Sequence, residues 1–289
     1  MIALVTGGTA GIGLQVAAKL RAAGLSVLIT GRDQSRGAAI EADLDATFLP
    51  ADHATIAGNL DLAQRLRERT PRLDVLVNNV GGAVFAERIR TVEGHEAIFA
   101  LNYLGPITLT HALLPALAAH ARVVQVVSTA FTMHSGDPFT EPPTYTAIAA
   151  YARAKQLNLL AIMSLARQLA GRATVNAVNP GMAWTPGVQA LTPQAVPAWR
   201  YVWPLVRMIQ RRASPEKAAR TPALLALHPT GSGRFHESSG KVKPLPRRLR
   251  DPARQDRAWQ SVIDTVRHHA INRPADTAGP HPQGVTDAI

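Results

Sequence analysis

Cysteine is absent from the 289 residues, which excludes disulfide bonds, thiolate zinc sites and cysteine nucleophiles. This absence fits a reducing compartment, and we expect a cytoplasmic protein. No stretch approaches the roughly 20 uninterrupted apolar residues of a membrane span. The apolar run Ile2–Val5 leads directly into a glycine turn, so no signal peptide is expected. The histidines lack metal-binding spacing, and we predict no metal site.

Acidic residues are scarce in the second half of the chain. Residues 1–144 contain 11 Lys and Arg against 13 Asp and Glu, whereas residues 145–289 contain 20 against 7. A basic half can serve nucleic acid, anionic lipid or a phosphorylated ligand. No basic stripe interleaved with aromatic residues and no reading-helix motif accompanies the charge. We therefore disfavour nucleic-acid binding.

Short apolar runs alternate with helical patterns along the chain. Strands are expected at about 2–6, 25–30, 46–50, 73–77, 122–127 and 174–178, and helices at about 11–23, 53–70, 91–119 and 150–171. A further helix is expected at 214–228, an edge strand within 234–243 and a last helix near 251–269. The alternation predicts an α/β fold: a single Rossmann-type domain with a doubly wound parallel sheet that binds ligands at the carboxyl ends of its strands.

A glycine cluster joins the first strand to the first helix, in Thr6-Gly7-Gly8-Thr9-Ala10-Gly11-Ile12-Gly13. Gly7 lets the chain turn, Gly11 lets a phosphate approach the backbone, and Gly13 lets the helix approach the sheet. Free N–H groups at the helix start suit the pyrophosphate of a dinucleotide. A plain flexible turn is the alternative. We assign to the cofactor site Gly7, Gly11, Ile12 and Gly13.

The second strand ends in Gly31-Arg32-Asp33. An acidic side chain at this point of a dinucleotide fold binds the ribose 2′-hydroxyl, whereas Arg32 suits a 2′-phosphate. We therefore favour NADP(H) over NAD(H), and we expect Asp33 to cap the next helix. Asp52, beyond the third strand, is assigned to the adenine amino group; a cap for the helix at 53–70 is a compatible alternative.

Polar and turn residues also follow the later strands: Asn79, Ser128 and Pro180. Because the carboxyl ends of parallel strands meet at one edge, these residues and the cofactor residues above are expected to lie together. Asn102 is a polar residue within an apolar helical run, so it needs a buried partner and hints at a site.

Tyr151 and Lys155 lie four residues apart, on one face of the expected helix. A tyrosine normally keeps its proton until about pH 10. A lysine cation nearby favours the phenolate and lowers that pKa, which makes the phenol a usable acid or base near neutral pH. By itself the pair is a weak signal, since a half-buried Tyr beside a solvated Lys is common.

Taken together, these residues resemble the classical short-chain dehydrogenase/reductase family over about residues 1–240. The matching motifs are Thr6-Gly7-x-x-x-Gly11-Ile12-Gly13, Asn78-Asn79-x-Gly81, Asn102, Ser128, Tyr151-x-x-x-Lys155 and Pro180-Gly181-x-x-x-Thr185. Asn102-Tyr103-Leu104-Gly105 and the long interval from Ser128 to Tyr151 resemble the retinol-dehydrogenase-like branch. Val80 replaces the usual alanine of the Asn-Asn-Ala-Gly motif. Ala10 stands where many NADP-dependent members carry a basic residue, so the choice of cofactor depends on Arg32 alone.

The resemblance implies a role for each catalytic residue. Tyr151 exchanges a proton with the substrate oxygen, and Ser128 hydrogen-bonds that oxygen. Lys155 lowers the pKa of Tyr151 and holds the nicotinamide ribose, and Asn102 holds a water in a proton relay to Lys155. Thr185 and the backbone near Pro180 position the carboxamide. The implied function is NADP(H)-dependent hydride transfer to or from a carbonyl or alcohol.

The resemblance also places a substrate lid at about 183–213. Its bulky apolar residues indicate a hydrophobic carbonyl or alcohol; a helix pair packed on the core and peripheral membrane contact are the alternatives. We assign residues 1–245 to the NAD(P)-binding domain with this lid, and 246–289 to a C-terminal helix and a disordered tail. Pairing through the helices at 91–119 and 150–171 would give a homodimer or homotetramer.

A second function remains open on the same fold, namely a non-enzymatic dinucleotide sensor or scaffold. It is disfavoured because a sensor does not need the four catalytic candidates together: Asn102, Ser128, Tyr151 and Lys155.

Overall fold

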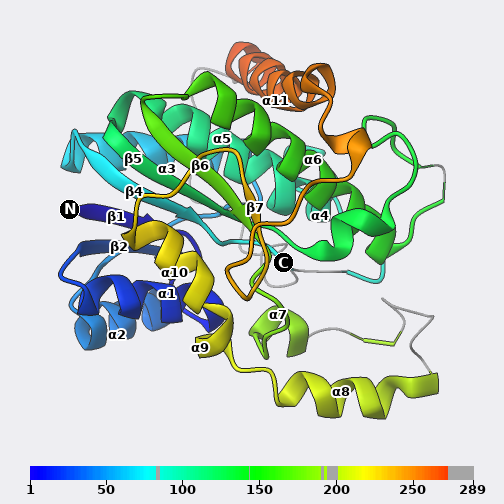
Figure 1. Ribbon diagram of the computed structural model, residues 1–289, viewed down its shortest axis with the longest axis horizontal. Coiled ribbons are helices and arrows are strands. Elements are labelled where there is room, and N and C mark those ends of the chain that lie inside the picture. Colours follow the sequence, from blue (N-terminus) through cyan, green and yellow to red (C-terminus); the bar gives the residue numbers. More distant parts are fainter. Residues whose placement is uncertain (83–84, 143, 190–191, 194–200, 273–289) are drawn as a thin grey trace.

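The computed structural model describes residues 1–82, 85–142, 144–189, 192–193 and 201–272. Within these residues seven strands form one sheet in the order β3-β2-β1-β4-β5-β6-β7, and all neighbouring strands are parallel (Figure 1). Strand order runs outward in both directions from the β1–β4 pair, which confirms the predicted doubly wound Rossmann domain. The strands are β1 Ile2–Val5, β2 Ser26–Gly31, β3 Thr47–Pro50, β4 Leu73–Asn78, β5 Leu117–Val126, β6 Ala173–Val178 and β7 Phe235–His236.

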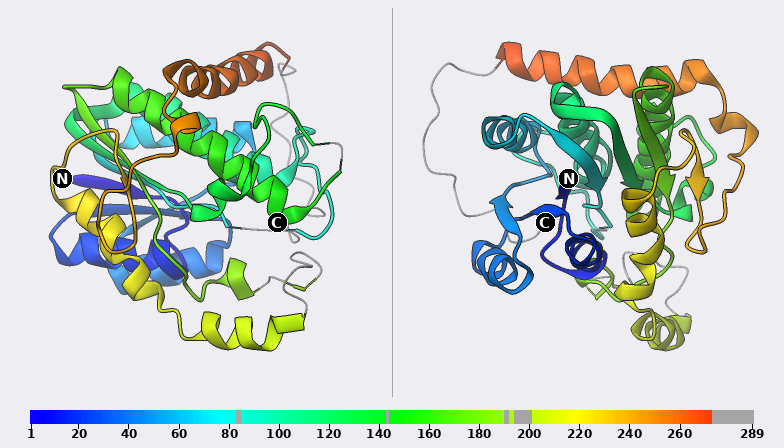
Figure 2. Two further views of the ribbon diagram at one scale, coloured as in Figure 1. Left: turned by 45° about the vertical axis from the view of Figure 1, so that its right-hand side comes forward. Right: turned by 60° about the vertical axis from the view of Figure 1, so that its left-hand side comes forward.

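Helices cover both faces of the sheet (Figures 1 and 2). The longer ones are α1 Gly11–Ala22, α2 Gln34–Leu44, α3 Ile56–Arg69, α5 Gly105–Leu113, α6 Ala147–Gln168, α8 Trp203–Arg211, α10 Arg220–Leu227 and α11 Pro252–Asn272. The short turns are α4 Ala97–Phe99, the π turn η1 Ala100–Leu104, the 3-10 turns η2 Leu114–Ala116, η3 Thr129–Met133 and η5 Arg247–Leu249, and α7 Pro186–Gln189 and α9 Pro215–Ala218.

Alternate residues of each strand supply the two halves of the core, as the strand period of two requires. In β1, Leu4 packs in the cluster with α3, α5, α6 and α11. Its neighbours Ala3 and Val5 pack on the opposite face, in the cluster with α1 and α10. All three side chains are fully buried, so the site at the strand ends rests on a rigid base.

The helix expected at 91–119 is shorter and broken. It begins at Ala97, because Gly94 turns the chain at φ +83° and the Glu96 carboxylate caps the helix by accepting from the N–H groups of Ile98 and Phe99, each at 2.8 Å. A π turn interrupts it, and the helix ends at Ala116. The alanine-rich segment that follows belongs to β5 because Leu117 pairs with Leu73 of β4 and Ala121 with Ala173 of β6, tertiary contacts that override helix propensity.

One other expectation needs correction, and one is confirmed by a short strand. The helix at 214–228 is split into α9 and α10, because Pro222 has no N–H to continue the hydrogen-bond ladder. Ser214 caps α9 as its position suggests, accepting from Lys217 N at 3.3 Å. The edge strand expected within 234–243 is only the two residues of β7.

Helix α11 lies outermost on one side of the molecule, across α6 and α5 (Figure 2). Ala258, Trp259, Val262 and Ile263 are buried in the same core as α6. The Tyr103 hydroxyl beneath it donates to Ala258 O. The two helices through which pairing was predicted are thus covered by α11, and pairing through that face stays a prediction. The predicted tail from residue 273 lies outside the described residues.

The segment Ala97–Ala116 is long and apolar enough to cross a membrane, with a mean hydropathy of 1.4. However, 78% of this window is buried inside the protein. We read it as a core helix, packed between α3 and α6.

Candidate active site

The glycine-rich loop after β1 leaves the first turn of α1 open to an anion. Gly7 and Gly11 adopt φ values of +65° and +55°, which disfavour residues with a side chain. No side chain caps α1, whose N-cap is Ala10, and no acidic residue lies in its first turn. A Cβ atom on Gly13 would lie 2.3 Å from Gly7 O, so only glycine allows this approach of helix and loop.

Thr6 joins the glycine loop to the loop after β4. Its Oγ1 accepts from the N–H groups of Asn79 and Val80, at 2.9 and 3.1 Å, and its carbonyl accepts from Asn79 Nδ2 at 2.9 Å. The two loops are 73 residues apart in sequence. Asn79 therefore lies beside the cofactor loop as predicted, and the predicted motif residue Thr6 is the group that holds it there.

A buried polar chain that sequence reasoning missed supports the same loop. Gly7 N donates to Thr30 Oγ1 at 3.2 Å, and Thr30 Oγ1 lies 2.7 Å from His53 Nε2. His53 Nδ1 lies 2.8 Å from Asn59 Oδ1, while Asn59 Nδ2 donates to the carbonyls of His53 and Thr55. The amide oxygen of Asn59 must accept, so we assign the neutral tautomer with the proton on Nδ1 and the Thr30 hydroxyl donating to Nε2. Burial lowers the pKa of His53.

Arg32 and Asp52 follow β2 and β3, at the same sheet edge. Arg32 is exposed, and Asp33 caps α2 by accepting from Arg36 N at 2.9 Å, as expected. Asp52 is half-buried and accepts from Ala54 N at 2.9 Å. The alternative role of Asp52 as the cap of α3 is wrong, because Thr55 is the N-cap and accepts from Gly58 N at 3.1 Å.

Asn102 lies in the π turn, a feature that often marks functional sites. Its Oδ1 accepts from Gly82 N at 2.9 Å, and its Nδ2 donates to Ile98 O at 2.9 Å. Asn158 Nδ2, one turn beyond Lys155 on α6, donates to Asn102 O at 2.6 Å. Asn158 was not predicted; its position three residues after Lys155 on the same helix was the available signal.

Ser128, Tyr151 and Lys155 meet where β5 ends against α6. Ser128 lies close enough to Tyr151 for its hydroxyl to act on the pKa of the phenol, and Lys155 Nζ lies 5.8 Å from the centroid of the Tyr151 ring. Lys155 is 2% exposed, and its Nζ donates to Val126 O at 3.4 Å. A Cβ on Gly81 would lie 2.8 Å from Lys155 Nζ and 2.7 Å from Asn102 Oδ1, so the β4 loop closes over both residues.

The predicted effect of Lys155 on Tyr151 is wrong for this geometry. Burial raises the pKa of Tyr151, and the nearby Ser128 hydroxyl opposes that rise in part. Lys155 is itself buried, which lowers its pKa to about 8 from 10.5. Tyr151 is thus kept protonated at neutral pH, a state that suits proton donation.

Thr185 and Pro180 follow β6, at the same carboxyl edge of the sheet as the residues above. A Cβ on Gly11 would lie 2.9 Å from Thr185 Cγ2, so the segment after β6 touches the glycine loop. Thr185 accepts from Val188 N at 3.4 Å, and Pro180 is buried beside Gly181, which turns at φ +80°.

The residues at this edge fit a dinucleotide. The uncapped first turn of α1 suits the pyrophosphate, and Gly7 and Gly11 leave room that a Cβ would fill. Asp52 and Arg32 lie at the ends of β3 and β2, and Asn79 lies beside the glycine loop, as does Thr185; their roles toward the two ends of a dinucleotide stay predictions. Among the described residues, no three His, Asp or Glu side chains group as metal ligands.

Comparison with known proteins agrees with this geometry. A family model described as short chain dehydrogenase matches residues 1–195. The chain belongs to the short-chain dehydrogenase/reductase family. Human dehydrogenase/reductase SDR family member 13 is 33% identical over 90% of this chain and 71% of its own length. Human retinol dehydrogenase 13 is 30% identical over 84% of this chain and 78% of its own length. These relatives confirm the predicted retinol-dehydrogenase-like branch.

Solved structures agree with this short-chain dehydrogenase/reductase in fold. A Mycobacterium paratuberculosis protein has a TM-score of 0.70 over 92% of both chains, at 24% identity. A Pseudomonas aeruginosa structure, described as an RhlG/NADP active-site complex, is 30% identical with a TM-score of 0.61, over 82% of this chain and 93% of that one.

Proposed function

We propose that this short-chain dehydrogenase/reductase is an NADP(H)-dependent oxidoreductase acting on a hydrophobic carbonyl or alcohol, with Tyr151 as the acid or base. The observation that carries the proposal is the contact of Ser128 with Tyr151 beside the buried Lys155, under the loop that also meets Asn102. A packing role alone does not account for so many polar groups converging at the ligand-binding edge.

The geometry supports a distinct role for each residue. When bound, the nicotinamide supplies or accepts the hydride. Tyr151, kept protonated by burial, donates its proton to the carbonyl oxygen, and Ser128 hydrogen-bonds the same oxygen as charge develops on it. We assign Lys155 to the nicotinamide ribose. Asn102 accepts from Gly82 N in the β4 loop, and we assign to it the water of a proton relay to Lys155.

Two observations support NADP(H) as the cofactor. Arg32 follows β2, where a 2′-phosphate would lie, and its planar donor fork matches a phosphate. The Pseudomonas aeruginosa structure and a 29% identical structure from Burkholderia cenocepacia are both described as complexes with NADP. The proposal of a hydrophobic substrate draws on relatives named retinol dehydrogenase 13 and polyprenol dehydrogenase.

Replacing Tyr151 tests the proposed chemistry. Tyr151→Phe removes only the hydroxyl, so we expect turnover to fall by about 10²–10⁴-fold while NADPH affinity and thermal midpoint stay near wild type. Rates are measured with NADPH on a panel of aliphatic, aromatic and isoprenoid aldehydes and ketones. The matched control is Tyr145→Phe, whose half-buried hydroxyl donates to Phe85 O at 3.3 Å.

The outcome also separates the two candidate functions. Near wild-type rates in Tyr151→Phe would remove the acid role from this residue. Tight NADPH binding by the wild type without turnover of any compound in the panel would favour the sensor or scaffold.

Replacing Arg32 tests the choice of cofactor. Because charged hydrogen bonds contribute about 1.5–3 kcal/mol, Arg32→Ala should weaken NADPH binding by about 10- to 100-fold and leave NADH binding unchanged. Nicotinamide fluorescence titration measures both. Arg36→Ala, which removes a nearby arginine paired with Asp33 at 3.5 Å, is the control. Equal losses for NADPH and NADH would contradict the assignment.

A further inference from the structure

Helix α8 presents an apolar face outward. Val202, Leu205, Met208 and Ile209 follow the spacing of one helical face and are 48, 53, 45 and 50% exposed. Tyr201, just before the helix, is 80% exposed. Surface helices of globular proteins normally turn such a face toward the core.

Polar groups hold the opposite side of α8 against the protein. Gln210 is 3% exposed. The Arg207 guanidinium stacks over the Trp184 ring at 4.5 Å and donates to Val188 O at 2.9 Å and Gln189 O at 3.2 Å. These contacts link α8 to α7 and fix which face points outward. The outward apolar face is therefore a consequence of defined contacts on the inner face.

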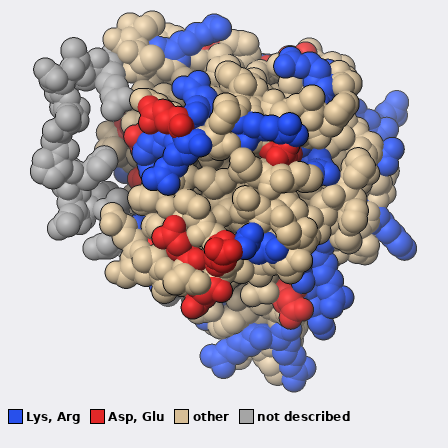
Figure 3. All heavy atoms as spheres, turned by 90° about the vertical axis from the view of Figure 1, so that its left-hand side faces the viewer, with Lys and Arg blue, Asp and Glu red and all other residues tan. Residues whose placement is uncertain are grey.

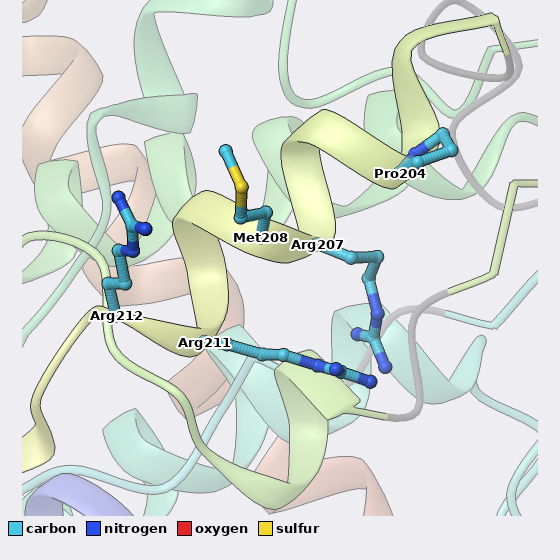
Figure 4. A pocket seen from close by; sticks show the side chains of 5 residues that line it. All are labelled: Pro204, Arg207, Met208, Arg211 and Arg212. Carbon is cyan, nitrogen blue, oxygen red and sulfur yellow. The ribbon is translucent and has the colours of Figure 1, made fainter.

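Positive charge borders the apolar face. The sequence contains no Asp or Glu from residue 142 to residue 215. Arg207 and Arg211 extend to one side of α8, while Met208 and Arg212 project from the other (Figure 4). Together with Pro204 these side chains line an open hollow of about 470 Å³. Lys and Arg also crowd the lower end of the molecule in Figure 3, the end where Figure 1 places α8.

We propose that α8 docks on an anionic lipid surface, with Val202, Leu205, Met208 and Ile209 inserted at the headgroup boundary and Arg211 and Arg212 contacting lipid phosphates. A helix with an apolar face, flanking arginines and no acidic residue has the chemistry of an interfacial helix. Long arginine side chains can bury their stems in the apolar layer and keep their charge at the phosphates.

Charge also decides against a second copy of the chain as the occupant. A two-fold pair brings the same patch of both copies together, so Arg211 and Arg212 would face their own counterparts without an acidic partner. An anionic lipid layer neutralises these charges. The inference concerns the outer face of α8 and does not rest on the proposed reaction.

Vesicle co-sedimentation of the full chain tests the proposal. Vesicles of phosphatidylcholine with about one third phosphatidylglycerol are compared with phosphatidylcholine alone, because anionic lipid attracts each nearby arginine. The triple variant Leu205→Ser/Met208→Ser/Ile209→Ser removes the apolar face. The matched control is Leu224→Ser/Val242→Ser/Ile271→Ser, which changes three side chains of similar or greater exposure away from α8. NADPH affinity and thermal midpoint check that both variants fold.

We expect the wild type and the control variant to bind the anionic vesicles, and the α8 triple variant to bind at least about tenfold more weakly. Arg211→Gln/Arg212→Gln should weaken binding to anionic vesicles and reduce its dependence on salt. No wild-type binding, or equal binding by the α8 triple variant, overturns the proposal. Light scattering without lipid provides a further check: a wild-type dimer that the α8 triple variant dissociates would assign the face to a second copy instead.

Discussion

The loops after β1, β3 and β4, which we call the cofactor loops, and helix α8 arrange polar and apolar side chains in opposite ways. In the cofactor loops, polar groups are buried and paired: Thr6 holds Asn79, and Thr30 with His53 holds Gly7. In α8, Gln210 and Arg207 face the protein while Leu205 and its apolar neighbours face outward. The loops thus have the character of a preformed rigid site, and α8 that of a surface awaiting a partner.

The contrast predicts how each region responds to substitution. Buried hydrogen bonds are costly to break because a group left unpaired loses its contact with water as well as its partner. Exposed apolar side chains contribute little to folding, whatever they contribute to binding. Substitutions in the cofactor loops should therefore reduce stability and cofactor affinity, whereas substitutions on α8 should change neither.

The largest effect is expected for Gly13→Ala. Its Cβ would lie 2.3 Å from Gly7 O and 2.5 Å from Asn79 Nδ2, so backbone must move. We expect a loss of about 3 kcal/mol in the free energy of unfolding, at the upper end of overpacking costs, and loss of NADPH binding. Denaturant unfolding and fluorescence titration measure the two. In the control, Gly136→Ala, the new Cβ would meet nothing nearer than 3.7 Å; a similar loss there would point to a general glycine effect.

The sequence predicts a residue of the cofactor loops only where a local motif defines that residue. The glycine loop, Asn79, Ser128 and Tyr151 were predictable, because a local motif defines each one and the carboxyl ends of parallel strands must share an edge. The chain from Thr30 through His53 to Asn59 was not, because its members lie in separate elements and have no spacing rule of their own.

Tertiary context also explains the wrong predictions. Residues 117–121 are alanine-rich and helical by propensity, yet they join β5 because Leu117 pairs with Leu73 of β4 and Ala121 with Ala173 of β6. The pKa of Tyr151 depends on how deeply it and Lys155 are buried, which a four-residue spacing does not reveal. Helix α8 is amphipathic in sequence, but only the contacts of Arg207 and the burial of Gln210 show which side faces the core.

The second prediction concerns His53. His53→Leu leaves the Thr30 hydroxyl and the Asn59 amide oxygen without their buried partner, so we expect a loss of about 2 kcal/mol in the free energy of unfolding. NADPH binding should weaken as well, because Thr30 accepts from Gly7 N. The exposed His268→Leu in α11 is the control. If His53→Leu were as stable as wild type, the polar chain would have no structural role.

His53 also predicts a dependence on pH. Burial lowers its pKa in the folded state below the ordinary value of 6.5, with Asp52 opposing this shift and Arg32 adding to it. The unfolded chain then binds the proton more readily, so stability falls as the pH drops below 6.5. Other histidines with lowered pKa contribute too, so the measurement is the difference between wild type and His53→Leu: the slope with pH should be shallower in the variant. Equal slopes would show that His53 does not titrate in this window.

A smaller effect is expected from the ionisation of Lys155. Burial lowers its pKa to about 8, so the cation is present below that pH and is lost as the pH rises through it. If Lys155 holds the nicotinamide ribose through its charge, NADPH affinity should fall by at most about tenfold per pH unit above pH 8. Lys155→Arg keeps its charge throughout this range and should flatten the profile. A wild-type profile that stays flat to pH 10 would contradict the lowered pKa.

The smallest effect is expected on α8, for Leu205→Ser. Leu205 is 53% exposed, and surface substitutions usually change stability by no more than about 0.5 kcal/mol. Its free energy of unfolding and NADPH affinity should both match wild type in denaturant and fluorescence titrations. A loss above about 1.5 kcal/mol, the scale of burying one such side chain, would mean that this face packs inside the protein in solution. The contrast between a rigid site and an open surface would then fail.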